Sequence, residues 1–131
     1  MRSNARVLKS AIILAVGASL CPAQLSLAQD SNFRDAPASV AVATNPYQGK
    51  PQAAAAGQKL YGQNCAQCHG KNLRGIGPAP PLDTASVKSA KPGELFWFIT
   101  NGKLTAGMPS WSSLPKQQRW QIITFLQTQT K

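Results

Sequence analysis

Five consecutive residues near the middle of the 131-residue chain constrain its structure more than any other feature. They read Cys65-Ala66-Gln67-Cys68-His69, which is the C-x-x-C-H pattern of covalent haem attachment. Two thiols separated by two residues can reach both vinyl groups of one haem as thioethers, and the adjacent histidine offers an imidazole nitrogen to the iron. The sequence therefore predicts one haem c, bound covalently through Cys65 and Cys68, with His69 as an iron ligand.

Two other kinds of site use closely spaced cysteines, and the surrounding sequence favours neither. A thioredoxin-like redox pair needs a βαβ setting, and the segments on either side of the motif show no such pattern. A structural zinc ion needs four ligands, whereas the chain has one histidine and three cysteines, of which Cys21 lies in a segment expected to be removed. Covalent haem attachment is therefore the prediction that best accounts for the motif.

Residues 1–28 have the three parts of a secretory signal peptide. Basic residues precede an apolar stretch at 11–20, and a small-residue exit ends at Ala28, after which we expect cleavage. An uncleaved membrane anchor is the first alternative, but the apolar stretch is short for one. Lipoprotein processing at Cys21 is the second, and a large leucine stands directly before that cysteine, where a small residue is usual. The sequence therefore predicts export to the periplasm, with no stable membrane span after cleavage.

Residues 29–52 are rich in Ala, Ser, Gln and Pro and show little periodic pattern. We expect them to form a flexible leader without a core of its own. The alternative is a strap that docks along the domain or a partner, through Phe33 and Tyr47. The haem-binding domain itself is expected at 53–131.

Three segments carry helix signals, and the predicted fold class is all-α. The first helix is expected at about 51–64, and the second at about 92–101, with Gly102 at its C-terminal exit. The last begins near Pro115 and carries an apolar stripe at helical spacing. The members of this stripe are Trp120, Ile122, Ile123, Phe125 and Leu126.

Met108 is the candidate for the second iron ligand, because the motif uses the one histidine and Met1 leaves with the signal peptide. It lies between Gly107 and Pro109, in a loop that can bend back over a haem. A thioether is soft and neutral, so as an iron ligand it favours the ferrous state and raises the reduction potential. An ordinary core position is the alternative, since methionine fills cores well.

The chain is strongly basic, with 14 Lys and Arg against 4 Asp and Glu and a formal net charge of +10. Three of these basic residues and none of the acidic ones lie in residues 1–28, so the mature chain would carry +7. Lys71 and Arg74 follow the motif, and Lys103 precedes Met108 by five residues. A basic rim there would steer the chain toward a redox partner with an acidic docking face; a generally basic, soluble surface is the alternative. Nucleic acid is not expected as a partner, and four acidic residues leave little for paired-carboxylate catalysis.

Taken in order, these motifs resemble the class I c-type cytochromes over about residues 53–129. The segments that carry the resemblance are 57–61, 65–70, 80–82, 107–109 and the final amphipathic helix. More narrowly, the segments 94–103 and 107–111 look like small bacterial monohaem cytochromes. Some of these accept electrons from quinoprotein dehydrogenases, which carry pyrroloquinoline quinone.

The resemblance implies three to four helices wrapped round one haem. The first and last helices would cross at Gly57, and Tyr61 would pack near Ile122 and Phe125. A domain of this size has a thin core by itself, so we expect the haem-free chain to be largely unfolded.

The resemblance also implies further residues of the haem pocket. A backbone carbonyl would accept a hydrogen bond from the second ring nitrogen of His69; Pro80 fits this role best, and Pro78 is the alternative. Trp111 and Trp97 would line the pocket or hold a haem propionate through the indole N–H, with plain core packing as the other interpretation.

The predicted function is that of a periplasmic, monomeric one-electron carrier rather than an enzyme. It would act between a donor dehydrogenase or membrane complex and an acceptor such as a terminal oxidase, with a quinoprotein dehydrogenase as one expected donor. Two alternatives remain. A small haem peroxidase or ligand sensor would need an open sixth iron site, and a haem subunit would stay bound within a dehydrogenase complex.

Overall fold

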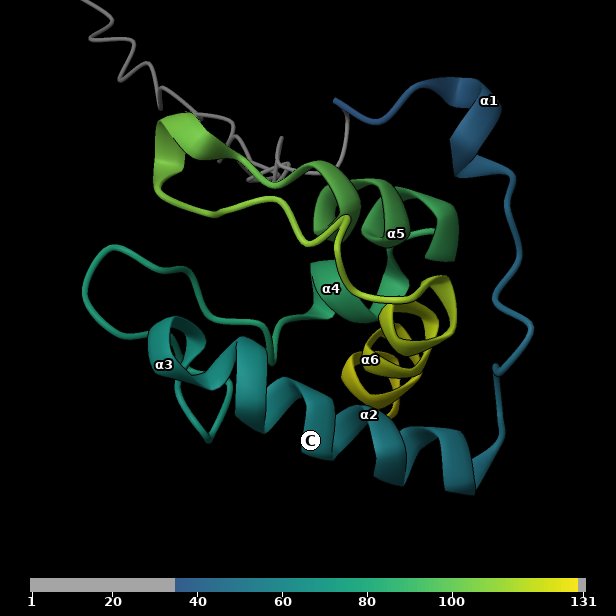
Figure 1. Ribbon diagram of the computed structural model, residues 1–131, viewed down its shortest axis with the longest axis horizontal. Helices are drawn as coiled ribbons and strands as arrows, with labels where there is room; N and C mark the ends of the chain where they lie inside the picture. Colours follow the sequence, from purple (N-terminus) through teal and green to yellow (C-terminus); the bar gives the residue numbers. More distant parts are fainter. Residues whose placement is uncertain (1–34, 130–131) are drawn as a thin grey trace, which may run out of the picture.

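The computed structural model describes residues 35–129, and every regular element in that range is a helix (Figure 1). The order is α1 (Ala38–Ala41), α2 (Pro51–Asn64), α3 (Ala66–His69), α4 (Ala85–Ser89), α5 (Pro92–Asn101), the 3-10 helix η2 (Leu104–Ala106) and α6 (Lys116–Thr128). The all-α prediction is confirmed, and the three expected helices are α2, α5 and α6. The predicted signal peptide at 1–28 and Phe33 lie outside the described residues.

Prolines and glycines mark the ends of the long helices, as the sequence indicated. Pro51 and Pro92 occupy the first turns of α2 and α5, where the missing N–H costs nothing because it would have no helical partner. The Glu94 carboxylate accepts a hydrogen bond from the Lys91 N–H at 3.0 Å, which satisfies one free donor before α5. The same helix ends at Gly102, whose φ of 69° favours glycine.

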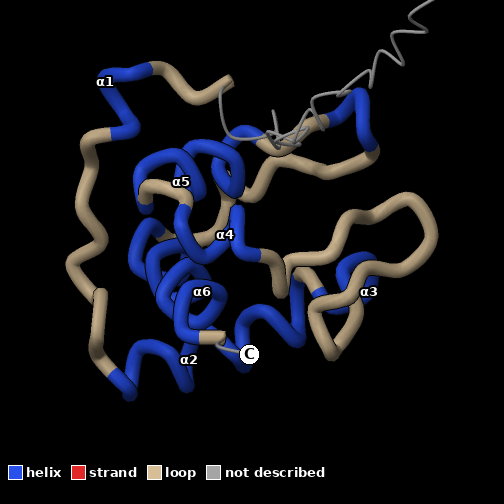
Figure 2. The backbone as a smooth tube through the Cα atoms, turned by 180° about the vertical axis from the view of Figure 1, so that it is seen from behind, coloured by secondary structure: helices blue, strands red, loops and turns tan. Residues whose placement is uncertain are grey.

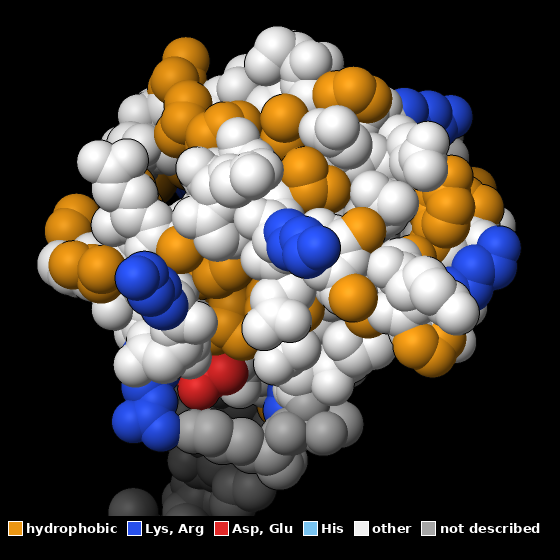
Figure 3. All heavy atoms as spheres, turned by 60° about the horizontal axis from the view of Figure 1, so that its bottom comes forward, with side chains coloured by type: hydrophobic (Ala, Val, Ile, Leu, Met, Phe, Trp, Pro, Cys, Tyr) orange, Lys and Arg blue, Asp and Glu red, His pale blue; other side chains and the backbone are white. Residues whose placement is uncertain are grey.

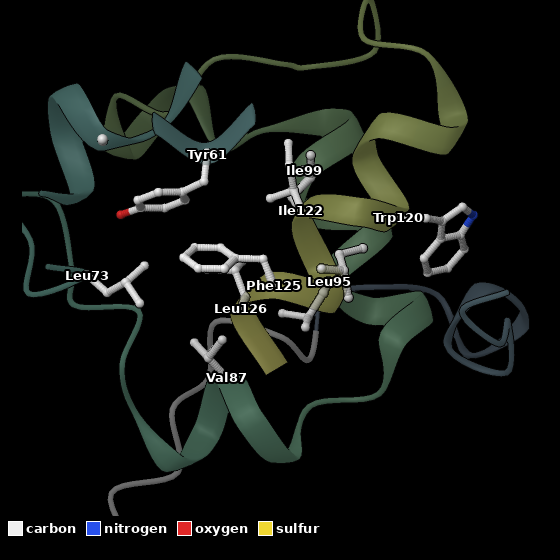
Figure 4. Close-up of a cluster of buried hydrophobic side chains, with 11 residues drawn as sticks. Tyr61, Leu73, Val87, Leu95, Ile99, Trp120, Ile122, Phe125 and Leu126 are labelled. Carbon is white, nitrogen blue, oxygen red and sulfur yellow. The ribbon is translucent and has the colours of Figure 1, made fainter. Parts of the chain in front are cut away.

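Helices α2 and α6 cross at very close range, and Gly57 makes this approach feasible. A Cβ atom at Gly57 would collide with the backbone carbonyl of Gln121 on α6. One turn further along α2, the ring centroid of Tyr61 lies 5.4 Å from that of Phe125. Figure 4 shows that these two rings lie in the middle of the apolar core, between Leu73 and Ile122. The crossing expected from the resemblance is therefore confirmed.

Residues 35–50, called the strap below, pack against the helices and do not form a leader without contacts. The buried Asn45 amide donates to Thr124 Oγ1 at 2.9 Å and to Trp120 O at 3.3 Å, both on α6. The backbone of Val40 in α1 lies so close to Gly93 in α5 that a Cβ there would collide with its carbonyl. The strap is held by one buried amide, by close backbone contacts and by Tyr47, which packs against the apolar core. For residues 35–50, the structure therefore matches the alternative of a docked strap and not the flexible leader that we expected.

Figures 1 and 2 show the strap running along one side of the molecule, from α1 beside α5 down to the start of α2. The side opposite the strap carries α3 and η2 together with the loops around them. Among residues 35–129, no helix is long and apolar enough to span a membrane.

Candidate haem site

The C-x-x-C-H motif forms one tight turn immediately after α2. Cys65 ends α2, and its carbonyl accepts hydrogen bonds from the backbone N–H groups of Cys68 at 3.2 Å and His69 at 2.9 Å. Both cysteines are free thiols; Cys65 is half-buried and Cys68 is exposed. Burial raises the pKa of the Cys65 thiol to about 11, with repulsion from Cys68 as the smaller cause. Two thiols and an imidazole therefore share a single turn of α3.

The imidazole of His69 is oriented by the loop that follows α3. Its Nδ1 lies 2.9 Å from the carbonyl oxygen of Pro80, so Nδ1 carries the proton and donates it to this acceptor. The other nitrogen, Nε2, then presents its lone pair away from that hydrogen bond and can bind a metal. Of the two prolines considered for this position, Pro80 is the one whose carbonyl meets His69.

Backbone hydrogen bonds hold the loop between Gly70 and Leu82 against α3. The Gly75 N–H donates to His69 O, and the Ile76 N–H donates to Cys68 O, both at 2.9 Å. The Leu82 N–H donates to the carbonyl of Leu73 at 2.7 Å and closes the far end of the loop. The loop therefore fixes the Pro80 carbonyl relative to the histidine that it orients.

Tyr61 and Leu73 contribute to this loop in ways that the sequence did not reveal. The buried hydroxyl of Tyr61 donates to Gly70 O at 2.7 Å, directly after the motif. Burial raises the pKa of the Tyr61 hydroxyl well above its ordinary value, and the nearby charge of Cys65 raises it further to a smaller extent. Leu73 adopts a φ of 66°, which is rare for a residue with a side chain, and is buried. A leucine in this conformation carries no sequence signal, unlike a glycine.

Met108 lies in a short hairpin-like loop at 102–111, called the methionine loop below. Lys103 and Met108 exchange two backbone hydrogen bonds, at 2.9 and 3.1 Å, across the η2 turn. Gly107 precedes the methionine with a φ of 80°, a conformation that favours glycine. The Met108 side chain is half-buried.

The methionine loop is anchored to the last turn of α5 just beyond Met108. The Trp111 N–H donates to Ile99 O at 3.0 Å, and the Ser110 hydroxyl donates to Thr100 O at 2.7 Å. The ring of Trp111 packs against the apolar core, and Trp97 on α5 lies edge-on to Phe98 with ring centroids 5.3 Å apart. Trp111 thus packs against the core and Trp97 against Phe98, and a haem-pocket role stays a prediction for both tryptophans.

The candidate site is built from two parts on the same side of the molecule. Figures 1 and 2 both show α3 and the methionine loop on the side away from the strap. The available donors are two thiols, one imidazole nitrogen and one thioether, which is the set that holds a haem c with His and Met ligands. Among residues 35–129, no three side chains of His, Cys, Asp or Glu form a group able to hold a metal ion. These residues fit a haem and give no four-ligand zinc site.

Charged and apolar side chains border these two parts at the surface. Lys71 and Arg74 are exposed, and Arg74 lies 4.0 Å from Asp83. Lys103 pairs with Asp35 of the strap at 3.5 Å; the two side chains are 39% and 55% exposed, so solvent screens the pair and it adds little stability. Ile76 and Leu104 are 58% and 78% exposed, which the sequence analysis did not anticipate.

Positive charge is widespread on the face of the molecule drawn in Figure 3. There, Lys and Arg side chains are scattered among apolar ones, while acidic side chains appear in one place.

Comparison with known proteins gives consistent matches over the part of the chain that contains these elements. The family model described as cytochrome c oxidase, cbb3-type, subunit III, matches residues 52–126. The cbb3-type cytochrome c oxidase subunit CcoP of Azospirillum brasilense is 40% identical over 68 residues, which are 46% of this chain and 22% of that protein. The chain therefore spans about a fifth of the length of this relative.

A solved structure matches the fold as well. The crystal structure of cytochrome CL from the marine methylotrophic bacterium Methylophaga aminisulfidivorans superposes with a TM-score of 0.55 and 28% sequence identity. The match covers 63% of this chain and 57% of that one.

Proposed function

This chain belongs to the class I c-type cytochromes, in the family described as subunit III of cbb3-type cytochrome c oxidase, and we propose that it carries single electrons in the periplasm with one haem c. The observation that carries the proposal is the turn holding Cys65, Cys68 and His69, with the His69 ring oriented by Pro80 O at 2.9 Å. The predicted signal peptide supports the location.

Each site residue has a defined task in this proposal. Haem, when bound, supplies an iron that accepts or releases one electron at a time. Cys65 and Cys68 would hold the ring covalently, and His69 Nε2 and the Met108 thioether would bind the iron. The Pro80 carbonyl keeps the proton on Nδ1, which makes the imidazole a better donor and fixes its plane.

Two iron ligands supplied by the protein would distinguish an electron carrier from a haem enzyme. A peroxidase or a ligand sensor needs a position at which a small molecule binds. Here Met108 lies in a loop closed by its own backbone bridge and anchored to α5 through Trp111 and Ser110. Such a restrained loop keeps the thioether in place, so the chain needs little rearrangement between oxidation states.

The surface around the site supports encounter with other redox proteins. Exposed Ile76 and Leu104 offer apolar contact, while Lys71, Arg74 and Lys103 supply positive charge. We infer a partner with an acidic docking face, because complementary charge accelerates encounter without requiring tight binding. A quinoprotein dehydrogenase as donor and a terminal oxidase as acceptor are the proposed partners, with the free chain acting as a monomer.

A permanently bound haem subunit is the second candidate function. It is favoured by the relative in Azospirillum brasilense, a subunit of a cbb3-type oxidase of which this chain spans about a fifth. Size-exclusion chromatography of a whole-cell extract solubilised in mild detergent separates the two. A haem-containing peak at the size of one chain supports the shuttle, whereas a large complex containing the haem supports the subunit.

Absorption spectra of the purified protein test the main proposal. With His and Met ligands we expect a weak far-red band in the ferric form and no change when carbon monoxide is added to the ferrous form. A missing band together with avid carbon monoxide binding would mean an open iron site, and the enzyme or sensor function would then replace the electron carrier.

A further inference from the structure

Arg119 on α6 is a half-buried cation whose surroundings the proposed function does not explain. Its guanidinium lies over the ring of Phe96, 4.6 Å from the centroid, and Nη1 donates to the hydroxyl of Thr100. Its Nε is buried and makes no hydrogen bond within residues 35–129. Neither ion pair found in that range involves Arg119. A guanidinium kept here without a carboxylate calls for a specific role, because desolvating a charge is costly.

Arg119 belongs to α6, but its guanidinium lies against the C-terminal half of α5, and these surroundings explain how its charge is tolerated. Phe96 and Thr100 lie on the last two turns of α5, where a helix presents unpaired carbonyl groups and a partial negative charge. The Phe96 ring in turn stacks on Trp120, with centroids 4.2 Å apart. The cation therefore contacts an aromatic face and a hydroxyl near the C-terminus of α5 in place of an acidic side chain.

Thr100 connects this cation to the methionine loop. Its hydroxyl accepts from Arg119 and donates to Phe96 O, while its backbone carbonyl accepts from the Ser110 hydroxyl at 2.7 Å. Ser110 is two residues beyond Met108 in the chain. Hydrogen bonds to the hydroxyl and to the backbone carbonyl of Thr100 thus link α6, through the last turn of α5, to the segment that carries the proposed iron ligand.

We propose that Arg119 is a positioning residue for Met108. By holding Thr100, it keeps the end of α5 where the Ser110 hydroxyl can reach it, and so sets the free energy needed to open the methionine loop. This inference rests on the proposed function, because Met108 must be an iron ligand for loop opening to expose the iron. Helix α6 would then control the opening of the methionine loop in addition to packing against α2.

Displacement of the axial ligand by imidazole measures the opening of the loop in the ferric holoprotein. An added ligand binds only when Met108 has left, so its apparent affinity reports the open population. Arg119→Met keeps an unbranched side chain but removes the charge and the donor. We expect it to bind imidazole roughly tenfold more tightly at constant neutral pH, as losing a hydrogen bond from a charged group predicts. Arg119→Lys, which keeps the charge without the planar fork, should lie between it and the unsubstituted protein.

Two further variants distinguish positioning from general packing. Lys116→Met removes a charge from an exposed position on the same helix and should leave the imidazole affinity unchanged. Thr100→Val removes the intermediate hydroxyl and should raise the affinity, with little added effect when combined with Arg119→Met. Equal affinities for Arg119→Met and Lys116→Met, or fully additive effects of Arg119→Met and Thr100→Val, would overturn the inference.

Hydrogen exchange gives a readout that does not depend on the iron ligand. The Lys103 and Met108 amides form the bridge that closes the methionine loop. In Arg119→Met both should exchange about tenfold faster, while the Cys65 amide at the end of α2 stays unchanged. Faster exchange confined to the methionine loop supports the positioning role of Arg119. If the spectra then show no sulfur ligand, only the proposal that Met108 binds the iron fails. Unchanged exchange in both Arg119→Met and Thr100→Val contradicts the positioning role.

Discussion

At the scale of single residues, the candidate site is organised by side chains that bind backbone carbonyls of one loop. His69 donates to Pro80 O at 2.9 Å, and Tyr61 donates to Gly70 O at 2.7 Å, so both ends of the loop after the motif are attached to α2 and α3. The motif predicted His69 and the cysteines directly, because the chemistry needs those residue types at that spacing. The contact of Tyr61 with Gly70 could not be predicted, since it depends on where the loop folds back.

Replacing Met108→Ala should keep the covalently attached haem and open one axial position. We expect loss of the far-red ferric band, carbon monoxide binding by the ferrous form and a lower reduction potential, because a ligand that favours ferrous iron is removed. Spectroscopy and a redox titration measure all three. Thr105→Ala, at an exposed position in the same loop, is the matched control. If Met108→Ala keeps the spectrum and potential of the unsubstituted protein, Met108 is not the ligand.

Tyr61→Phe keeps the ring against Phe125 and removes the hydrogen bond to Gly70 O. We expect a loss of about 1 kcal/mol of unfolding free energy at pH 7, measured by denaturant titration of the holoprotein. The pKa of Tyr61 is raised in the folded state, so its contribution is complete below the unfolded value of 10.0 and falls as the pH rises above it. The stability gap between the two proteins should therefore narrow above about pH 10. A gap that widened there would contradict burial of a neutral hydroxyl.

At the scale of elements, local signals predicted the long helices, and tertiary contacts decided the rest. Proline in the first turn and Gly102 at the exit delimited α5, because both residues act on their own backbone. The sequence analysis gave a docked strap only as the alternative to a flexible leader, since this docking depends on Asn45 meeting carbonyl and hydroxyl groups on α6. Helix α4 was also missed; it has five residues, too few for a periodic apolar pattern.

Two glycines in α2 allow a matched test of the helix crossing. Gly57→Ala should destabilise the holoprotein by about 2–4 kcal/mol, because its Cβ would collide with a backbone carbonyl of α6 that cannot move alone. Gly62→Ala has open space around the new Cβ and should be neutral or stabilising by up to about 1 kcal/mol. Thermal melts of both variants measure the difference. Equal stabilities would mean that α2 and α6 do not cross at Gly57.

At the scale of the whole molecule, the apolar core reaches the candidate site from one side. The buried cluster lies where α2, α5 and α6 meet (Figure 4) and includes Ala66 and Leu73, while backbone hydrogen bonds also hold the loops around α3 and Met108. Ile76 and Leu104 stay exposed in these loops. A haem bound between the two parts would supply apolar contacts that the protein chain does not provide there.

Removing the haem should therefore cost most of the folded structure. A domain of this size buries only about 60% of its unfolded surface and is marginally stable without added apolar mass. The double variant Cys65→Ser/Cys68→Ser removes both attachment points and gives a haem-free chain, for which we expect a large loss of helical far-UV circular dichroism and no cooperative melt. Gln67→Ala is the control: it changes an exposed residue between the two cysteines but leaves both attachment points, so this variant should keep its haem and its cooperative melt. A cooperative melt with native helix content in the haem-free chain would contradict this prediction. It would show that the apolar cluster around α2 and α6 is sufficient for folding and that the haem does not contribute to it.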